Sequence, residues 1–582
     1  MEEKVTPQEL CAKYWALHQA TYDFFDIDFD IFGRTATTEQ TRIAQEIFLQ
    51  LHENGYLQEK TSTQLYCEAH HSFLADRFVE GTCPRCGYED ARGDQCDKCG
   101  NLLEPFDLIN PRCKLDKDTK PIPRDTKHIH LLLDKLQPQI EEWVERSSRE
   151  GSWSKNGRVI TEAWLKEGLK DRAITRDLKW GTPVPLPGYE NKVLYVWFDA
   201  CIGYPSITAN YTKHWEKWWR NPEQVKLYQF MGKDNVPFHT VIFPGSQMGT
   251  KTIWTKLHHI STTEYLQYEN GKFSKSRGIG VFGNSAAKTN VPASVWRYYL
   301  LSCRPETGDS QFEWQTFIQK NNSELLANLG NFVNRLIKFV NAKMDGKVPD
   351  YEPKLDRPGF SEFKQDVDKL LASYLEDLDA VRIRSGLERV MAISARGNLF
   401  LQDNKLDNSL LLNQPEIAAA VVGMGLNLVY LLSAIVYPYM PMTAASIAEQ
   451  LNAPLRKIPD YWTATDLLPG HEINAAAHLF SRIDPKKADE WKEEFGGSQA
   501  SQLKREEAEA KKKAKAEDKR RKASRKAQKA VEEAGGSVSE MGDVLPAELQ
   551  TPQPKPKSTP PVKGMAALAV SEERKADRPS LT

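Results

Sequence analysis

The order of apolar and polar residues predicts that the first half of the chain alternates helices with strands. Helical spacing occurs at residues 9–23, 38–56, 131–147 and 159–168. The segment "FDIDFDIFG" (25–33) alternates apolar and acidic residues, which predicts a strand. The apolar start of 192–204 predicts a buried strand, and 226–239 predicts a second apolar strand that runs into a Gly-Lys-Asp turn. Strands that alternate with helices indicate a parallel sheet.

From about residue 315 to residue 495 the pattern is helical instead. Within 322–340, one face collects the large apolar residues Leu325, Leu329, Phe332, Val333 and Leu336. Residues 417–440 carry no charge over a length that could cross a bilayer. We interpret this run as the buried core helix of a bundle, because it stands alone and contains Asn427 and Pro438. No membrane association is expected.

The last part of the chain has a different composition. Residues 503–529 hold 13 Lys and Arg against 5 Asp and Glu, with almost no large apolar residue. Residues 551–561 are rich in proline, which predicts an extended, disordered segment. The basic segment is either a solvated helix or a contact for RNA or an acidic partner, such as a synthetase complex. The sequence leaves both readings open.

Length and composition restrict the class of protein. A chain of 582 residues exceeds a single core, so several domains are expected. The net charge of −1 argues against a uniformly basic nucleic-acid binder. The N-terminus lacks a secretion signal, and six of the nine cysteines fall within residues 67–113. In an unsecreted chain this spacing favours metal ligation over disulfides.

Two Cys-x-x-Cys pairs predict a structural zinc site. They are Cys83, Cys86, Cys96 and Cys99, with nine residues between the pairs. Two such knuckles supply the four thiolates of a closed tetrahedral site. The alternative, a redox dithiol, rarely comes as facing pairs. A second, weaker set surrounds the first, and its harder donors suit zinc less well: Cys67, His70, Cys113 and Asp116.

A glycine-bracketed basic loop lies within "YENGKFSKSRGIGVFG" (268–283). Such a loop binds phosphate or is an ordinary exposed turn. Its core, Lys272-Phe273-Ser274-Lys275-Ser276, resembles the Lys-Met-Ser-Lys-Ser signature of class I aminoacyl-tRNA synthetases. The runs "YVWFDACIGY" and "YQFMGKDNVPFH", with the cysteine pairs before them, resemble methionyl-tRNA synthetases. The wording of "GKFSKSRGIGVFG" and "RDLKWGTPVP" is similar to eukaryotic cytosolic members of the fungal type. The likeness covers about residues 5–495.

The resemblance implies a methionine–tRNA ligase of the cytoplasm, which activates methionine with ATP and Mg²⁺ and transfers it to tRNA(Met). Lys272 and Lys275 are the implied catalytic residues, because mobile ammonium groups stabilise charge on the leaving phosphates. The ATP-binding set is Gly232, Asp234, Lys272, Ser274, Lys275 and Ser276. The methionine pocket implied is Trp197, Ala200, Tyr204, Phe238 and His239. Cys201 receives no role.

The helical half resembles the anticodon-binding bundle of this family. Asn331 and Arg335, four residues apart, match the pair that reads the CAU anticodon. A lone Asn/Arg pair on a helix is otherwise a solvated face. Bacterial members place a tryptophan beside the anticodon where this chain has "NKLDN" (404–408). The stacking residue therefore stays unassigned.

The fold class expected is α/β plus all-α, with an incomplete Rossmann-like parallel sheet and a zinc-knuckle connective domain. No His-x-Gly-His signature occurs in the sequence. We therefore expect an N-terminally truncated synthetase, inactive by itself. The alternatives are a non-catalytic tRNA-binding or scaffold fragment and a different nucleotidyl-transferring enzyme. The predicted domains are a first Rossmann remnant (1–36), the connective domain (37–173), the second Rossmann half (174–314), the anticodon-binding bundle (315–495) and the charged tail (496–582).

Overall fold

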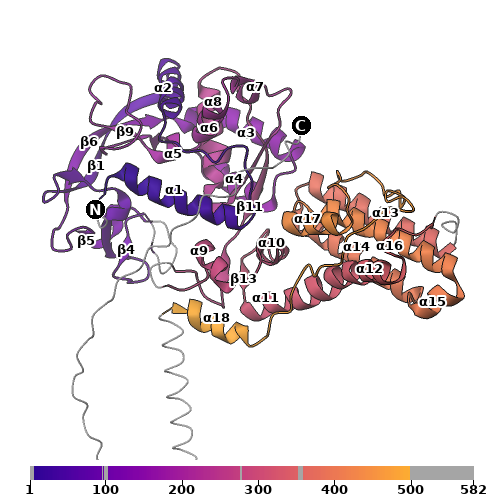
Figure 1. Cartoon of the computed structure of the whole chain (residues 1–582). Coiled ribbons are helices and arrows are strands. Elements are labelled where there is room, and N and C mark those ends of the chain that lie inside the picture. The colour runs from indigo at the N-terminus through magenta and orange to yellow at the C-terminus, as the bar shows by residue number, and fades with distance from the viewer. Residues whose placement is uncertain (1–4, 95, 97–102, 275–277, 352–357, 498–582) are drawn as a thin grey trace, which may run out of the picture. The chain divides into compact units, whose positions relative to one another are not determined.

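The computed structural model describes residues 5–94, 96, 103–274, 278–351 and 358–497 (Figure 1). Contacts divide the chain into two units, 1–502 and 503–582. The predicted basic segment and the proline-rich segment of the tail belong to the second unit and lie outside the described residues. Everything below concerns the first unit.

The α/β part confirms the predicted helices. Its helices are α1 (Pro7–Phe24), α2 (Thr38–Glu53), α3 (Leu133–Glu150), α4 (Lys155–Glu167), α5 (Val196–Asp199), α6 (Gly203–Tyr211), α7 (Glu216–Trp219), α8 (Phe243–Gly249), α9 (Gly283–Ala286) and α10 (Ala293–Ser302). Local signals start the first two. Thr6 forms a capping box with Glu9 ahead of α1, and the Thr37 side chain caps α2.

The strands form several small sheets. They are β1 (Leu57–Cys67), β2 (Ser72–Phe73), β3 (Val79–Thr82), β4 (Ala91–Arg92), β5 (Ile109–Cys113), β6 (Ile122–Leu131), β7 (Arg172–Ala173), β8 (Thr175–Arg176), β9 (Val193–Leu194), β10 (Leu227–Gly232), β11 (Leu257–Thr263), β12 (Leu266–Tyr268) and β13 (Ser310–Phe312). Strands β10 and β11 pair in parallel, as do β12 and β13, which confirms the predicted parallel arrangement. The strand predicted for residues 226–239 is shorter than expected, because β10 ends at Gly232 and helical turns follow, and its Tyr228 and Phe230 are exposed. The strands from β1 to β7 pair antiparallel instead, in the orders β2-β1-β6-β7 and β4-β3-β5.

The strand predicted for residues 25–33 is wrong. These residues, all of them described, form no strand. The Arg297 side chain donates hydrogen bonds to the carbonyl oxygens of Phe25 and Asp26, so a guanidinium occupies acceptors that a neighbouring strand would otherwise use. The ring of Phe32 packs 5.2 Å from Tyr22 of α1. The alternation of apolar residues in 25–33 thus reflects packing of these side chains against α1, not a strand.

The strand predicted for residues 192–204 is also largely wrong, since only β9 is extended and α5 follows at once. The amide of Phe198 donates to the carbonyl of Tyr195 and that of Ala200 to Val196, which closes helical turns. Phe198 and Ile202 are both buried. Their spacing of four residues suits a helix, whereas a continuous apolar run does not distinguish helix from strand.

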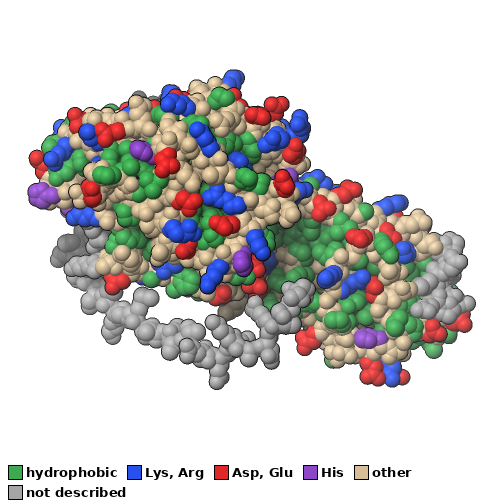
Figure 2. Space-filling model, turned by 90° about the horizontal axis from the view of Figure 1, so that it is seen from above, with side chains coloured by type: hydrophobic (Ala, Val, Ile, Leu, Met, Phe, Trp, Pro, Cys, Tyr) green, Lys and Arg blue, Asp and Glu red, His purple; other side chains and the backbone are tan. Residues whose placement is uncertain are grey.

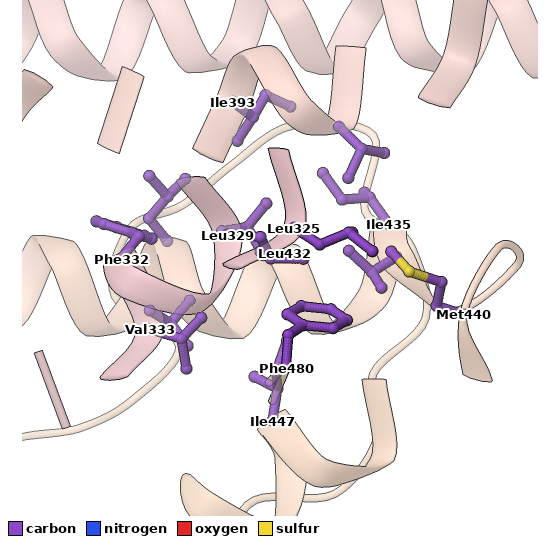
Figure 3. Close-up of a cluster of buried hydrophobic side chains, with 14 of the residues drawn as sticks. Leu325, Leu329, Phe332, Val333, Ile393, Leu432, Ile435, Met440, Ile447 and Phe480 are labelled. Carbon is purple, nitrogen blue, oxygen red and sulfur yellow. The ribbon is translucent and has the colours of Figure 1, made fainter. Parts of the chain in front are cut away.

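The helical part contains α11 (Trp314–Lys320), α12 (Asn331–Lys343), α13 (Pro358–Asp379), α14 (Ile383–Asp403), α15 (Asn408–Asn413), α16 (Pro415–Val436), α17 (Pro441–Gln450) and α18 (Lys487–Phe495). A π-helix, η7 (Asn321–Gly330), joins α11 to α12. The five apolar residues predicted to share one face of 322–340 are all buried. Figure 3 shows Leu325, Leu329, Phe332 and Val333 in the bundle core, with Phe480 beside them.

Helix α16 confirms that the uncharged run is a core helix: 94% of its most apolar stretch is buried within the protein. Its Asn427 is fully paired, since the side chain donates to Tyr351 and Gly423 and accepts from the amide of Leu467. The helical prediction fails across residues 452–486, all described, which contain no helix. Prolines interrupt this segment repeatedly, at Pro454, Pro459, Pro469 and Pro485.

The described residues have three hydrophobic cores. One spans Ile43 to Ile260, one spans Tyr268 to Phe495, and a small one lies between Leu65 and Cys113. The described residues on both sides of the basic loop, Tyr268 and Ile279, therefore belong to the same core as the helical bundle. On the face shown in Figure 2, acidic and basic side chains are interspersed. This distribution agrees with the net charge near zero.

Candidate functional site

The described part of the basic loop is anchored at its base. Ser274 and Ile279 exchange two backbone hydrogen bonds of 2.9 Å. The Phe273 ring lies 5.4 Å from Tyr268, and a Cβ atom on Gly280, whose φ is +111°, would lie only 2.1 Å from this ring. Lys272 is exposed beside this anchor. The predicted residues Lys275 and Ser276 lie outside the described residues.

The predicted adenosine-binding turn follows the carboxyl end of β10. A 3₁₀ turn, η3 (Lys233–Asn235), carries Asp234, whose carboxylate accepts a 2.6 Å hydrogen bond from Tyr265. This bond raises the pKa of the Tyr265 hydroxyl to about 12. A Cβ atom on Gly232 would meet nothing within 4 Å. The turn is therefore open to a ligand, while Lys233 is paired with Glu264.

The residues predicted to bind methionine lie close together, although α5 and the start of α6, which carry three of them or border them, lie in a segment that was predicted as a strand. Trp197 lies on α5, Tyr204 on α6, and Phe238 and His239 begin the π-helix η4 (Phe238–Ile242). The rings of Trp197 and Phe238 are 5.4 Å apart, and the Tyr204 hydroxyl lies 2.8 Å from His239 Nε2. Trp197, Ala200 and Tyr204 are exposed, whereas His239 is buried. Together they make an aromatic surface backed by one imidazole.

The hydrogen bonds fix the state of this imidazole. His239 Nδ1 lies 2.7 Å from the carbonyl oxygen of Asn235, so Nδ1 carries the proton. Burial lowers the pKa of His239, which keeps the ring neutral. Nε2 is then an acceptor, and the Tyr204 hydroxyl donates to it. This bond orients the hydroxyl of Tyr204 at the exposed surface.

Two titratable groups of this region were not among the predicted site residues: Cys201, to which the sequence assigned no role, and Asp199, which was not considered. Cys201 Sγ lies 3.7 Å from His239 Nε2, and burial raises the pKa of the Cys201 thiol to about 12. Asp199 accepts a hydrogen bond from Thr182, and burial raises the pKa of its carboxyl to about 6. Strongly shifted groups often mark functional sites. The helical spacing of the apolar residues Phe198 and Ile202 is the signal that could have predicted a helix here, and with it the positions of Asp199 and Cys201.

The Asp199 shift predicts a pH-dependent stability. The pKa in the folded chain exceeds the value of 3.8 in the unfolded chain, so folding favours the neutral acid and stability is lost as the pH rises towards 6. We expect Asp199→Asn to stabilise the α5–α6 region by about 2 kcal/mol at pH 7 and by little at pH 4. Amide exchange in α6 measures this, with the exposed Glu223→Gln as control. An equal gain at both pH values would contradict it.

Two groups of side chains among the described residues are arranged so that they could hold a metal ion. Cys83, Cys86 and Cys96 place their sulfur atoms within 4.8 Å of one another, and so do the ligand atoms of Cys67, His70 and Cys113. Cys99 lies outside the described residues. Asp116 is not part of the second group, because its carboxylate accepts hydrogen bonds from Thr119 and the amide of Asp118. Thiolate-rich sets of this kind suit Zn²⁺.

The predicted anticodon pair lies on α12, where Asn331 and Arg335 are both exposed. Arg335 Nη2 donates a 2.9 Å hydrogen bond to the carbonyl of Leu406, in the segment 404–408. Residues flanking Leu406 line a pocket of about 610 Å³, which includes Phe400, Arg396, Asn404, Lys405 and Asp407. Arg396 Nη1 is buried without a hydrogen-bond partner among the described residues. Two of the lining residues are engaged within the bundle: the Phe400 ring is buried and stacks 4.0 Å from the Phe363 ring, and Arg396 Nε donates to Asp366.

Comparison with known families identifies the relationship. The family described as "tRNA synthetases class I (M)" matches residues 1–337. The chain belongs to the methionyl-tRNA synthetase family. The family described as "Anticodon binding domain of methionyl tRNA ligase" matches residues 357–500. The synthetase catalytic fold and the helical anticodon-binding domain are thereby established, and the family is one of enzymes.

Curated relatives of this synthetase family agree. The chain is 61% identical over 499 residues to "Methionine--tRNA ligase, cytoplasmic" of Saccharomyces cerevisiae, covering 86% of this chain and 66% of the relative. It is 62% identical over 501 residues to the probable cytoplasmic enzyme of Schizosaccharomyces pombe, covering 86% and 64%. The human cytoplasmic enzyme is 48% identical over 504 residues, covering 86% and 56%. The chain thus spans less than two thirds of the length of these relatives.

Solved synthetase structures show the same fold. A Mycobacterium tuberculosis methionyl-tRNA synthetase in complex with methionyl-adenylate aligns with a TM-score of 0.66 and 18% identity, covering 83% of this chain and 88% of that chain. Its ligand-free form aligns with a TM-score of 0.63 and 18% identity, covering 82% and 88%. At these identities the likeness supports the fold alone.

Proposed function

We propose that the chain carries the methionine-, ATP- and tRNA-binding parts of a cytoplasmic methionine–tRNA ligase. The observation that carries the proposal is the aromatic cluster of Trp197, Tyr204, Phe238 and His239 beside the open turn after β10. Ligands of parallel α/β sheets bind outside the carboxyl ends of the strands. The named relatives are cytoplasmic methionine–tRNA ligases.

Recognition of methionine by this cluster is chemically reasonable. A thioether has weak hydrogen-bonding capacity and interacts well with aromatic rings. Trp197 and Phe238 offer such rings, and the small side chain of Ala200 is exposed beside α5. Because His239 is neutral, no positive charge lies beside the apolar side chain of methionine. Tyr204, fixed by His239, offers one oriented hydroxyl.

We assign ATP to the turn after β10 and to the basic loop. Gly232 and Asp234 would contact the ribose, and Lys272, Ser274, Lys275 and Ser276 the phosphates. In the proposed reaction the methionine carboxylate attacks the α-phosphorus and pyrophosphate leaves. Lys272 and Lys275 would stabilise the charge on the departing phosphates. Mg²⁺, when bound with ATP, would neutralise phosphate charge.

We assign tRNA(Met) to the helical domain, with Asn331 and Arg335 reading the anticodon. An exposed amide and guanidinium suit the edges of unstacked bases. The neighbouring pocket supports this assignment, because polar and charged side chains line it, among them Asn404, Lys405 and Asp407. We further infer that zinc at Cys83, Cys86, Cys96 and Cys99 is structural, and that Cys67, His70 and Cys113 form a second, weaker site. The basic tail remains a candidate contact for RNA or a synthetase complex.

Methionine binding tests the proposal directly. We expect the chain to bind methionine in isothermal titration calorimetry, and Tyr204→Phe to bind it about 3- to 10-fold more weakly. The weakening follows because Tyr204 loses its bond to His239 and with it a fixed orientation. Tyr211→Phe on the same helix, exposed and distant from His239, is the matched control. No methionine binding by the unsubstituted chain would refute the assignment.

ATP–pyrophosphate exchange with methionine separates the remaining alternatives. Exchange by the 582-residue chain would overturn the expectation that it is inactive by itself. Exchange with another amino acid would overturn the methionine assignment. Specific tRNA(Met) binding with neither methionine binding nor exchange would favour a non-catalytic tRNA-binding protein.

A further inference from the structure

Helix α18 contacts both sides of the loop that carries Lys272, although the two are far apart in the sequence. The Gly280 amide, on the C-terminal side of the loop, donates a 2.8 Å hydrogen bond to the carbonyl of Phe495. On the N-terminal side, Lys492 Nζ lies 2.9 Å from Glu269 Oε2. Figure 1 shows α18 beside α11, with β13 and α9 nearby. One short helix is thus joined to both ends of the loop.

A chain of aromatic side chains continues this connection towards Lys272. The rings of Trp491 and Phe495 lie 4.8 Å and 5.6 Å from the ring of Trp314. Trp314 Nε1 donates a 2.9 Å hydrogen bond to the Tyr268 hydroxyl, and the Tyr268 ring lies 5.4 Å from Phe273. Phe273 is the residue directly after Lys272. Buried, close-packed rings transmit a displacement because they leave little free volume.

Glu269 is the point at which these contacts meet. Its carboxylate pairs with Lys492 through Oε2, and Oε1 accepts a 2.9 Å hydrogen bond from the amide of Trp314, the first residue of α11. Its backbone has a φ of +46°, a left-handed conformation that non-glycine residues keep only where their surroundings impose it. The turn leading to Lys272 is therefore held by α11 and α18 together.

We propose that α18 positions Lys272 for the phosphates of ATP, with Lys492 and Phe495 as positioning residues. The inference rests on the proposed function, since it assigns ATP phosphates to Lys272. Neither residue needs to touch ATP. Lys492 holds the turn before Lys272 through Glu269, and Phe495 holds the backbone after the loop through Gly280. The last helix of the anticodon-binding domain thereby becomes part of the ATP site.

Substitution of Lys492 tests this in the full chain. Lys492→Gln is expected to weaken ATP binding about 3- to 5-fold, the scale of a partly exposed ion pair, and to leave adenosine binding unchanged. Adenosine lacks the phosphates that Lys272 would contact, so its affinity should not depend on the position of Lys272. A general loss of folding, in contrast, would lower the affinities for ATP and adenosine equally. Lys492→Arg should restore ATP binding. Lys487→Gln is the matched control, because Lys487 pairs with Glu490 on the same helix, 2.6 Å away.

Hydrogen exchange provides a second readout that needs no ligand. Peptides covering residues 266–274 and 278–286 should exchange faster in Lys492→Gln than in Lys487→Gln. Equal ATP affinity in the two variants, or equal weakening of ATP and adenosine, would overturn the proposal. If the unsubstituted chain does not bind ATP, the ATP assignment fails. The exchange comparison then decides alone whether α18 holds the loop. Faster exchange in Lys492→Gln supports that role of α18, and unchanged exchange overturns it.

Discussion

Removal of zinc is expected to unfold the region between Leu65 and Cys113 while the helical domain stays folded. The hydrophobic core of this region is small, and four of its ten buried members are cysteines: Cys67, Cys83, Cys96 and Cys113. In the proposed sites, metal bonds would join Cys67 at the end of β1 to Cys113 at the end of β5, and Cys83 after β3 to Cys96 after β4. Structural zinc sites contribute about 10 kcal/mol or more of apparent binding free energy, which no core of this size replaces.

The measurement combines metal analysis with amide exchange. Zinc content should be at least one equivalent per chain, and a chelator should raise exchange in β3–β5 without raising it in α16. Cys83→Ser should lose one equivalent, whereas Cys11→Ser, at an exposed cysteine, should lose none. A content of two equivalents that drops to one in Cys113→Ser would show that the second group is occupied. A metal-free chain with unchanged exchange would contradict the structural role.

Arg335→Ala is expected to weaken binding of tRNA(Met) by about 10- to 100-fold, the loss typical of one base-reading side chain. The reason is the loss of the guanidinium donors on the exposed face of α12. The bond from Arg335 to the Leu406 carbonyl also orders the segment that lines the neighbouring pocket. Both effects act on the anticodon end of the tRNA.

Filter binding or fluorescence anisotropy measures this, with tRNA(Met) and the same tRNA carrying a changed anticodon. The unsubstituted chain should discriminate between them, and Arg335→Ala should lose most of this discrimination. Lys338→Ala removes an exposed positive charge from the same helix and should lower both affinities only slightly. If Lys338→Ala and Arg335→Ala weaken both tRNAs alike, the contact is non-specific attraction to phosphate.

Helices were predictable from the sequence where a capping residue or a regular apolar spacing was enough to define them. The capping threonines and regular apolar spacing define α1 and α2, and the face of 322–340 is buried as its period indicates. The uncharged run is a core helix, and its buried Asn427 and Ser433 are both paired inside the bundle. The signature residues themselves indicated the family, which the family match over residues 1–337 confirms.

Contacts between distant segments were not predictable. The apolar run at 192–204 suits a strand or a helix equally, and the packing of Phe198 and Ile202 into the core selects the helix. Alternation at 25–33 resembled a strand, but Arg297 and α1 supply its partners. The sequence by itself determined the family, the helical and α/β halves and the candidate residues. Only the tertiary structure decided the neutral state of His239, the raised pKa of Asp199 and the link from α18 to the Lys272 loop, because burial and long-range hydrogen bonds exist only once the chain has folded.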